Sequence, residues 1–151
     1  MKQVFTPQFE GFRDRILDKA SQNPFLQYTG FRIEKIDVAE VVLSLMPEAH
    51  HFQQTGFIHG GLTATAADIA TGLAAYTLIG SNEHVVTADL NVSYLNPGTK
   101  GILVARGFVI KAGRMLHFCE GEVLMRDGND EVLIAKATST MAVIRESDLR
   151  K

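Results

Sequence analysis

The order of apolar and polar positions along the chain predicts a short helix, two strands, a longer helix and then further strands. From Phe9 to Ala20, apolar residues recur every three or four positions among charged ones. This spacing is typical of an amphipathic helix, here over residues 8–21. A proline at position 24 ends the pattern. We therefore expect residues 1–22 to form an N-terminal helix ahead of the main body.

Alternating apolar and polar residues separated by turn signals predict strands in most of the remaining chain. The predicted strands cover residues 28–36, 39–46, 86–94, 102–112, 115–126 and 131–144. The short turns between successive strands favour an antiparallel sheet, with the last four strands in meander order. The charged segment 145–151 is expected to be a flexible tail.

Between the two groups of strands, residues 60–78 are rich in alanine and leucine, which are strong helix formers. Apolar residues occupy nearly every face of this predicted helix, so it should be buried. We expect a curved antiparallel sheet to wrap around it. The sequence thus predicts an α+β protein with one domain over residues 1–151 and an extra N-terminal helix.

The composition of the chain argues against several classes of function. The chain has 151 residues, 46% of them hydrophobic and 21% charged, with a net charge of −2, which does not suit a nucleic-acid partner. Its one cysteine, Cys119, excludes a disulfide within the chain. We see no signal-peptide pattern at the N-terminus and no apolar run long enough for a membrane span. We therefore expect a cytoplasmic protein without membrane partners.

Asp68 is the strongest candidate for chemistry. It is the only charged side chain between Thr55 and Asn82, and it falls inside the alanine-rich helix. A carboxylate in such a place is costly unless it is paired or used. A structural hydrogen bond or ion pair would explain a buried aspartate in general. Here we favour a functional role because of the residues at the start of the same helix.

His59-Gly60-Gly61 stands where the long helix is predicted to begin. The first backbone N–H groups of a helix lack partners, and the helix dipole makes this end positive. Glycine lets a ligand approach the backbone, so Gly60 could bind an oxyanion or a polarised carbonyl. A tight turn into the helix would explain the glycines equally simply. Asp68 lies eight residues later, about 12 Å along the axis, so we expect any shared site to combine two subunits.

The run Gln53-Gln54-Thr55-Gly56-Phe57-Ile58-His59-Gly60-Gly61, followed by Ala67-Asp68, resembles the hotdog-fold thioesterases of the phenylacetate-degradation (PaaI) type. The resemblance is closest from Gly56 to Asp68. It implies the hotdog fold, a homodimer that often pairs into a tetramer, and hydrolysis of acyl-coenzyme A to a free acid and coenzyme A. It implies no cofactor, because coenzyme A belongs to the substrate.

The resemblance also implies roles for catalytic residues. Asp68 falls on the carboxylate that acts as general base or as nucleophile, and Gly60 on the backbone N–H that polarises the thioester carbonyl. His59 falls on the histidine that shapes this site, and Thr87 on a hydroxyl that helps to hold the attacking water. Gln53 replaces the usual asparagine.

Substrate-binding roles are expected for a second group of residues. Basic residues beside a glycine turn could bind the phosphates of coenzyme A, although an ordinary charged hairpin tip fits as well. It remains open whether the first or the second glutamine of the motif meets the substrate. The predicted binding residues are Gln54, Gly61, Asn91, Lys111, Gly113 and Arg114.

Other readings are weaker. Three histidines at positions 50, 51 and 59 lack regular metal-ligand spacing, so we predict no metal site. His117 and Cys119 face one side of a strand, but nothing indicates an activated thiolate.

Rival functions are an acyl-thioester hydratase or dehydratase, and a protein that binds acyl-coenzyme A without cleaving it. Aromatic and aliphatic residues could line an acyl pocket or simply fill the core, namely Phe52, Phe57, Ile58, Leu62 and Tyr76.

Overall fold

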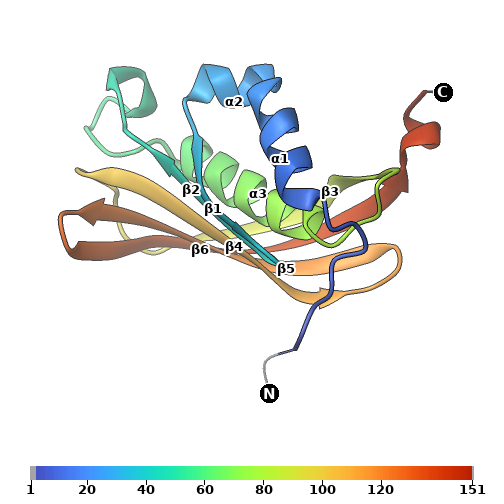
Figure 1. Cartoon of the computed structure of the whole chain (residues 1–151). Helices are drawn as coiled ribbons and strands as arrows, with labels where there is room; N and C mark the ends of the chain where they lie inside the picture. The colour runs from blue at the N-terminus through green and yellow to red at the C-terminus, as the bar shows by residue number, and fades with distance from the viewer. Residues whose placement is uncertain (1–2, 151) are drawn as a thin grey trace.

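The computed structural model describes residues 3–150 and contains one long helix on a six-stranded antiparallel sheet (Figure 1). This confirms the predicted architecture, including the extra N-terminal helix. The α-helices are α1 (Phe12–Ser21), α2 (Pro24–Thr29) and α3 (Gly60–Tyr76). The strands are β1 (Arg32–Asp37), β2 (Glu40–Leu45), β3 (Glu83–Tyr94), β4 (Ile102–Ala112), β5 (Leu116–Asp127) and β6 (Asp130–Arg145). Two 3-10 helices cover Ala49–His51 and Glu146–Arg150.

The strand order is β1-β2-β4-β5-β6-β3, so the expected meander of the last four strands is wrong. Strand β3 pairs with β6 rather than with β4, and it forms one edge of the sheet. Hairpin signals in the sequence report only neighbours along the chain, whereas this pairing joins strands that are distant in sequence. Between Thr87 and Asp89 the β3–β6 register shifts by one residue, which marks a β-bulge.

Helix α3 packs closely against the sheet because both surfaces carry small side chains. Ala67, Ala70 and Thr71 are buried. Beneath them lie Gly107 on β4 and Gly121 on β5, which are directly paired across the two strands. A Cβ atom at Gly107 would overlap the carbonyl of Ala70, so only glycine allows this approach.

The N-terminal region contains two helices, where the sequence pattern predicted a helix and then a strand from residue 28. Asn23 caps α2 by accepting hydrogen bonds from the backbone N–H groups of Phe25 and Leu26 at 3.0 and 3.2 Å. Pro24 therefore begins a helix, a position that suits its fixed φ. Gly30 ends this helix with a φ of 86°, and the first strand starts only at Arg32.

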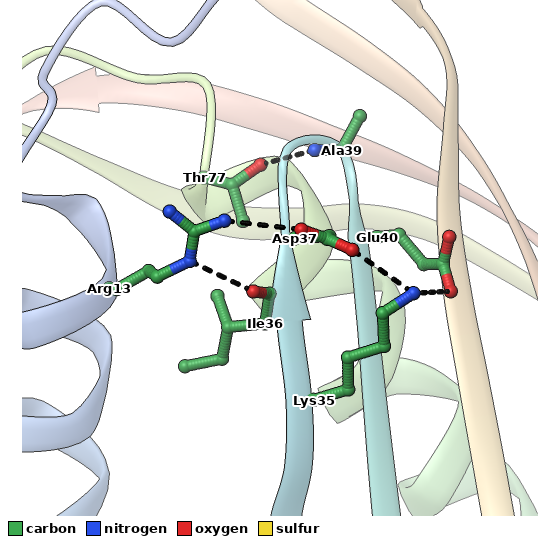
Figure 2. Close-up of polar contacts among 7 residues, drawn as sticks. All are labelled: Arg13, Lys35, Ile36, Asp37, Ala39, Glu40 and Thr77. Carbon is green, nitrogen blue, oxygen red and sulfur yellow. Dashed lines mark hydrogen bonds and ion pairs between the residues drawn. The ribbon is translucent and has the colours of Figure 1, made fainter.

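Polar contacts fix α1 to the β1–β2 hairpin (Figure 2). Arg13 donates to the Ile36 carbonyl and to the Asp37 carboxylate, both at 3.1 Å. At the turn of the hairpin, the Thr77 hydroxyl accepts from the N–H of Ala39 at 2.8 Å. The hairpin thus joins α1 to the C-terminal end of α3, and both α1 and α2 lie on the same side of the sheet as α3 (Figure 1).

The C-terminal segment is more regular than expected. Glu146–Arg150 forms a 3-10 helix where a flexible tail was predicted. The N–H of Glu146 donates to the Asn82 carbonyl at 2.9 Å, which ties this segment to the loop before β3. Lys151 lies outside the described residues. Within residues 3–150, no helix is both long enough and apolar enough to cross a membrane.

Candidate active site

The N-terminal end of α3 presents a backbone N–H group. His59 is the N-cap residue, and its Nδ1 accepts a hydrogen bond from the N–H of Gly61 at 3.0 Å. Tyr94 from β3 donates its hydroxyl proton to the Gly60 carbonyl at 2.8 Å. No hydrogen bond within residues 3–150 uses the Gly60 N–H. This group therefore points an unshared donor out of the positive end of the helix.

Asp68 sits on the third turn of α3, half-buried, with its carboxylate directed at the edge strand. The Thr87 hydroxyl donates to Asp68 Oδ1 at 2.7 Å. Thr87 is the last residue before the bulge in β3, and its hydroxyl also lies 3.6 Å from the sulfur of Met141. Asp68 Oδ2 takes part in no hydrogen bond within residues 3–150, so this oxygen can accept a proton from water.

Asp68 and Gly60 open into different hollows of one protomer. The first, about 220 Å³, contains Asp68 and Thr87. The second, about 550 Å³, contains Gly60, Gly61 and Gln53. Gln53 thus lies beside the helix start.

Of the other predicted binding residues, Gln54 is exposed and lines neither hollow. Asn91 lies in a small hollow with Glu120 and Lys136, on the face of the sheet opposite to α3. This placement separates Asn91 from Asp68 and Gly60 within one protomer.

The basic turn between β4 and β5 lies at the other end of α3 from Gly60. The N–H of Val109 donates to the Ala39 carbonyl, and Ala39 contacts Thr77 just after α3. Lys111, Gly113 and Arg114 follow at the exposed tip of this hairpin. One protomer therefore does not bring these residues to the helix start.

The histidines and the cysteine outside this region have structural environments. His51 accepts from the N–H of Glu48 at 2.9 Å and lies 3.0 Å from the Thr29 carbonyl, so its ring is fully occupied. Burial raises the pKa of the Cys119 thiol to about 12, which rules out a ready thiolate next to His117. No cluster of metal-binding side chains occurs in the part of the chain that the structure describes.

The predicted pocket-wall residues divide into two groups. Phe57 and Ile58 line the hollow beside Gly60, whereas Phe52 and Leu62 pack against the core. Tyr76 lines the hollow that contains Asp68.

The sequence reading missed the contribution of the N-terminal helices to this hollow. Its lining includes Lys19 and Ala20 from α1, and Phe25 from α2, together with His84 from β3. The Asn23-Pro24 pair was the available signal, because an N-cap followed by proline starts a helix as readily as proline ends one.

Comparisons with known proteins identify the family and the fold of the chain. The family model described as thioesterase superfamily matches residues 55–132, more than half of the chain. The medium/long-chain acyl-CoA thioesterase YigI of Salmonella typhimurium is 27% identical over 135 residues, covering 80% of this chain and 85% of its own length.

Two solved structures show the same fold. A thioesterase family protein from Silicibacter pomeroyi superposes with a TM-score of 0.86 at 28% identity, covering 89% of this chain and 99% of that one. The E. coli PaaI protein from the phenylacetic acid degradation operon shares the fold, with a TM-score of 0.80 at 17% identity over 91% of this chain and 96% of its own.

Proposed function

The chain belongs to the thioesterase superfamily, and we propose that it hydrolyses acyl-coenzyme A thioesters with Asp68 as the catalytic carboxylate. The observation that carries this proposal is the 2.7 Å hydrogen bond from the Thr87 hydroxyl to Asp68, which orients a half-buried carboxylate in an otherwise uncharged stretch of helix. One oxygen is held by Thr87, and the other is available to a water molecule. The medium/long-chain activity in the name of the Salmonella relative supports an acyl-coenzyme A substrate.

In the proposed reaction, Asp68 removes a proton from water while the water oxygen attacks the thioester carbon. The carbonyl oxygen gains negative charge and accepts a hydrogen bond from the Gly60 N–H at the positive end of α3. The carbon–sulfur bond then breaks, and the proton held by Asp68 passes to the coenzyme A sulfur. The balance is one thioester and one water giving one acid and one thiol, so neither a metal nor an organic cofactor is required.

We further propose that the working site combines Asp68 of one subunit with Gly60 of another. The eight-residue separation places them about 12 Å apart along α3, and they face separate hollows. Strand β3 carries Thr87 and Tyr94, which touch these two residues, and its outer edge is free to pair with a second copy. A homodimer formed along β3 would bring the two half-sites together.

Two further roles belong to the assembled protein. The pairing of dimers into a tetramer could use the apolar side chains exposed on the outer face of the sheet, such as Leu116 and Phe118, which are 40% and 42% exposed. Lys111 and Arg114 form no ion pair within residues 3–150 and are proposed to bind the phosphates of coenzyme A.

The test is thiol release from acyl-coenzyme A, followed with a colorimetric thiol reagent. Asp68→Asn keeps the shape of the side chain but removes the base, and we expect at least a hundredfold loss of kcat. Asp130→Asn, the same change at an exposed hairpin turn, is the matched control and should act like the wild type.

Three outcomes would redirect the proposal. Wild-type turnover in Asp68→Asn would remove this residue from the chemistry. Consumption of an enoyl thioester without thiol release would indicate a hydratase, and saturable binding without any turnover would indicate an acyl-coenzyme A-binding protein.

A further inference from the structure

A groove lined by α3, β3 and the N-terminal helices leads away from Asp68, and Figure 1 shows how these elements are arranged. It begins at Asp68 and Thr87, and Gly72 and Met141 line its middle. Asp68, Gly72 and Tyr76 follow one another at four-residue spacing, so they form one stripe along the helix. Tyr76 lies two turns beyond Asp68, about 12 Å along the axis.

The sides of the groove are apolar. Ile16 and Ala20 from α1 and Leu26 from α2 face Leu73 and Ile69 of α3. Burial of this surface by an apolar ligand is favourable at about 25 cal/mol per Å². The groove therefore suits a hydrocarbon chain or ring along its length.

The wall formed by α1 is fixed in position. Arg13 holds it to the β1–β2 hairpin through Asp37 (Figure 2), and Arg15 on the same helix donates to the Gly80 carbonyl at 2.7 Å. Phe12 and Ile16 are almost fully buried. A wall anchored at several points can select ligands by length, because it does not simply move aside.

The far end of the groove is polar and rich in hydrogen-bond donors. The Tyr76 hydroxyl and His84 Nδ1 lie 3.0 Å apart. If Tyr76 donates, the histidine keeps its Nε2–H, and if His84 donates, the tyrosine keeps its O–H; either arrangement leaves one donor unshared. Burial, together with the positive charge of Lys19, lowers the pKa of His84, which keeps the ring neutral near pH 7.

Lys19 adds three more donors at this end. Its ammonium group forms no ion pair with any carboxylate in residues 3–150, and Lys19 lines the groove with Tyr76 and His84. A ligand that ended in a methyl group would place hydrocarbon against the unshared donor of the part-buried Tyr76–His84 pair, which is unfavourable. A ligand that ended in an oxygen acceptor would satisfy this donor.

We propose that this groove binds the acyl group with its thioester at Asp68, and that it selects medium-length acyl groups carrying an oxygen hydrogen-bond acceptor at the far end. The inference rests on the proposed thioester hydrolysis. It adds a substrate class, namely acyl chains bearing a hydroxyl, carbonyl or carboxylate remote from the thioester, and it assigns the selection to Tyr76, His84 and Lys19.

The experiment compares decanoyl-coenzyme A with ω-hydroxydecanoyl-coenzyme A by thiol release. We expect the wild type to favour the ω-hydroxy substrate about fivefold in kcat/KM, the value of one net hydrogen bond. Tyr76→Phe, His84→Phe and Lys19→Met combined in one protein remove all of these donors and should bring this ratio close to one, and Tyr76→Phe alone removes one of them. Tyr28→Phe makes the same chemical change at an exposed position of α2 outside the groove, and it should keep the wild-type ratio.

Gly72→Val provides a second measurement that does not depend on the polar end. Valine has a higher helix propensity than glycine, so α3 should remain intact. A Cβ at this position would lie 3.9 Å from Met141, in ordinary contact, and the added methyl groups would narrow the groove. We expect the ratio of decanoyl to acetyl turnover to fall severalfold.

The outcomes separate the inference from the proposed function. Equal kcat/KM for the two decanoyl substrates in the wild type, or an unchanged ratio in the protein that carries all three replacements, would overturn the assignment of the polar end. An unchanged decanoyl-to-acetyl ratio in Gly72→Val would overturn the placement of the acyl chain. Absence of thiol release from every acyl-coenzyme A would instead refute the thioesterase proposal, and this inference with it.

Discussion

Replacement of Gly107 by alanine tests whether the close approach of α3 to the sheet determines both stability and the position of Asp68. The new Cβ would overlap the Ala70 carbonyl and would lie 2.6 Å from the Thr71 nitrogen, where ordinary contact starts at 3.4 Å. The helix backbone must therefore move by at least the difference, 3.4 − 2.6 = 0.8 Å. Overpacking of this kind costs about 1–3 kcal/mol.

Replacement of glycine by alanine at a position without steric conflict usually raises the free energy of unfolding, because it restricts the unfolded chain. A decrease in Gly107→Ala would therefore point to the overlap with α3. With a urea m-value of about 2 kcal/mol/M, a cost near 2 kcal/mol lowers the unfolding midpoint by about 1 M. Urea unfolding followed by circular dichroism at a fixed protein concentration gives this midpoint. Thiol release by the folded variant should also fall, since Asp68 lies two residues before Ala70 on the displaced helix.

Gly121 offers the matched control. A Cβ there would meet a Thr71 methyl group at 3.2 Å, and a side chain can yield where a backbone cannot. We expect Gly121→Ala to cost less than about 1 kcal/mol. A Gly107→Ala protein that unfolded at the wild-type midpoint would show that the helix does not sit as close to β4 as described.

Three other predictions address single groups. Thr87→Val removes the hydroxyl that donates to the Asp68 carboxylate, and under the proposed function the loss of a hydrogen bond to a charged group should lower kcat about tenfold or more; an unchanged kcat would show that Thr87 takes no part in the reaction. Cys119, with a pKa raised to about 12, should react with a thiol reagent only after unfolding; modification of the native protein would contradict its burial. Burial lowers the pKa values of His51, His84 and His117, so below their unfolded pKa of about 6.5 the unfolded chain binds more protons and stability falls; a urea midpoint at pH 5.5 equal to or above that at pH 7.5 would refute this.

Local patterns in the sequence predicted those parts of the candidate site that lie on α3. The helix from Gly60, its N-terminal glycines and the carboxylate at Asp68 all follow from residues close together in sequence. Thr87 came from the family resemblance, and the structure places its hydroxyl on the Asp68 carboxylate. The contact between Thr87 and Asp68 depends on the position of β3 in the sheet, and no local pattern in the sequence predicts that position.

The features that the sequence did not reveal depend on distant pairings. Strand β3 pairs with β6, which lies more than forty residues further along the chain, and Thr87 is thereby placed opposite Met141. The paired glycines at positions 107 and 121 give α3 room to approach the sheet, and this role becomes visible only when the position of the helix is known. The groove wall from α2 was missed because a six-residue helix is too short to show periodicity.

The position of β3 also bears on how the protein behaves when it is dilute or freshly synthesised. This strand is 12 residues long, and it forms an edge of the sheet with unpaired backbone donors and acceptors. Such an edge can pair with any extended chain that it meets, not only with a second copy in the correct register. If the proposed homodimer forms along this edge, it would also protect the strand from pairing with other chains, and protomers that are kept apart should aggregate more readily.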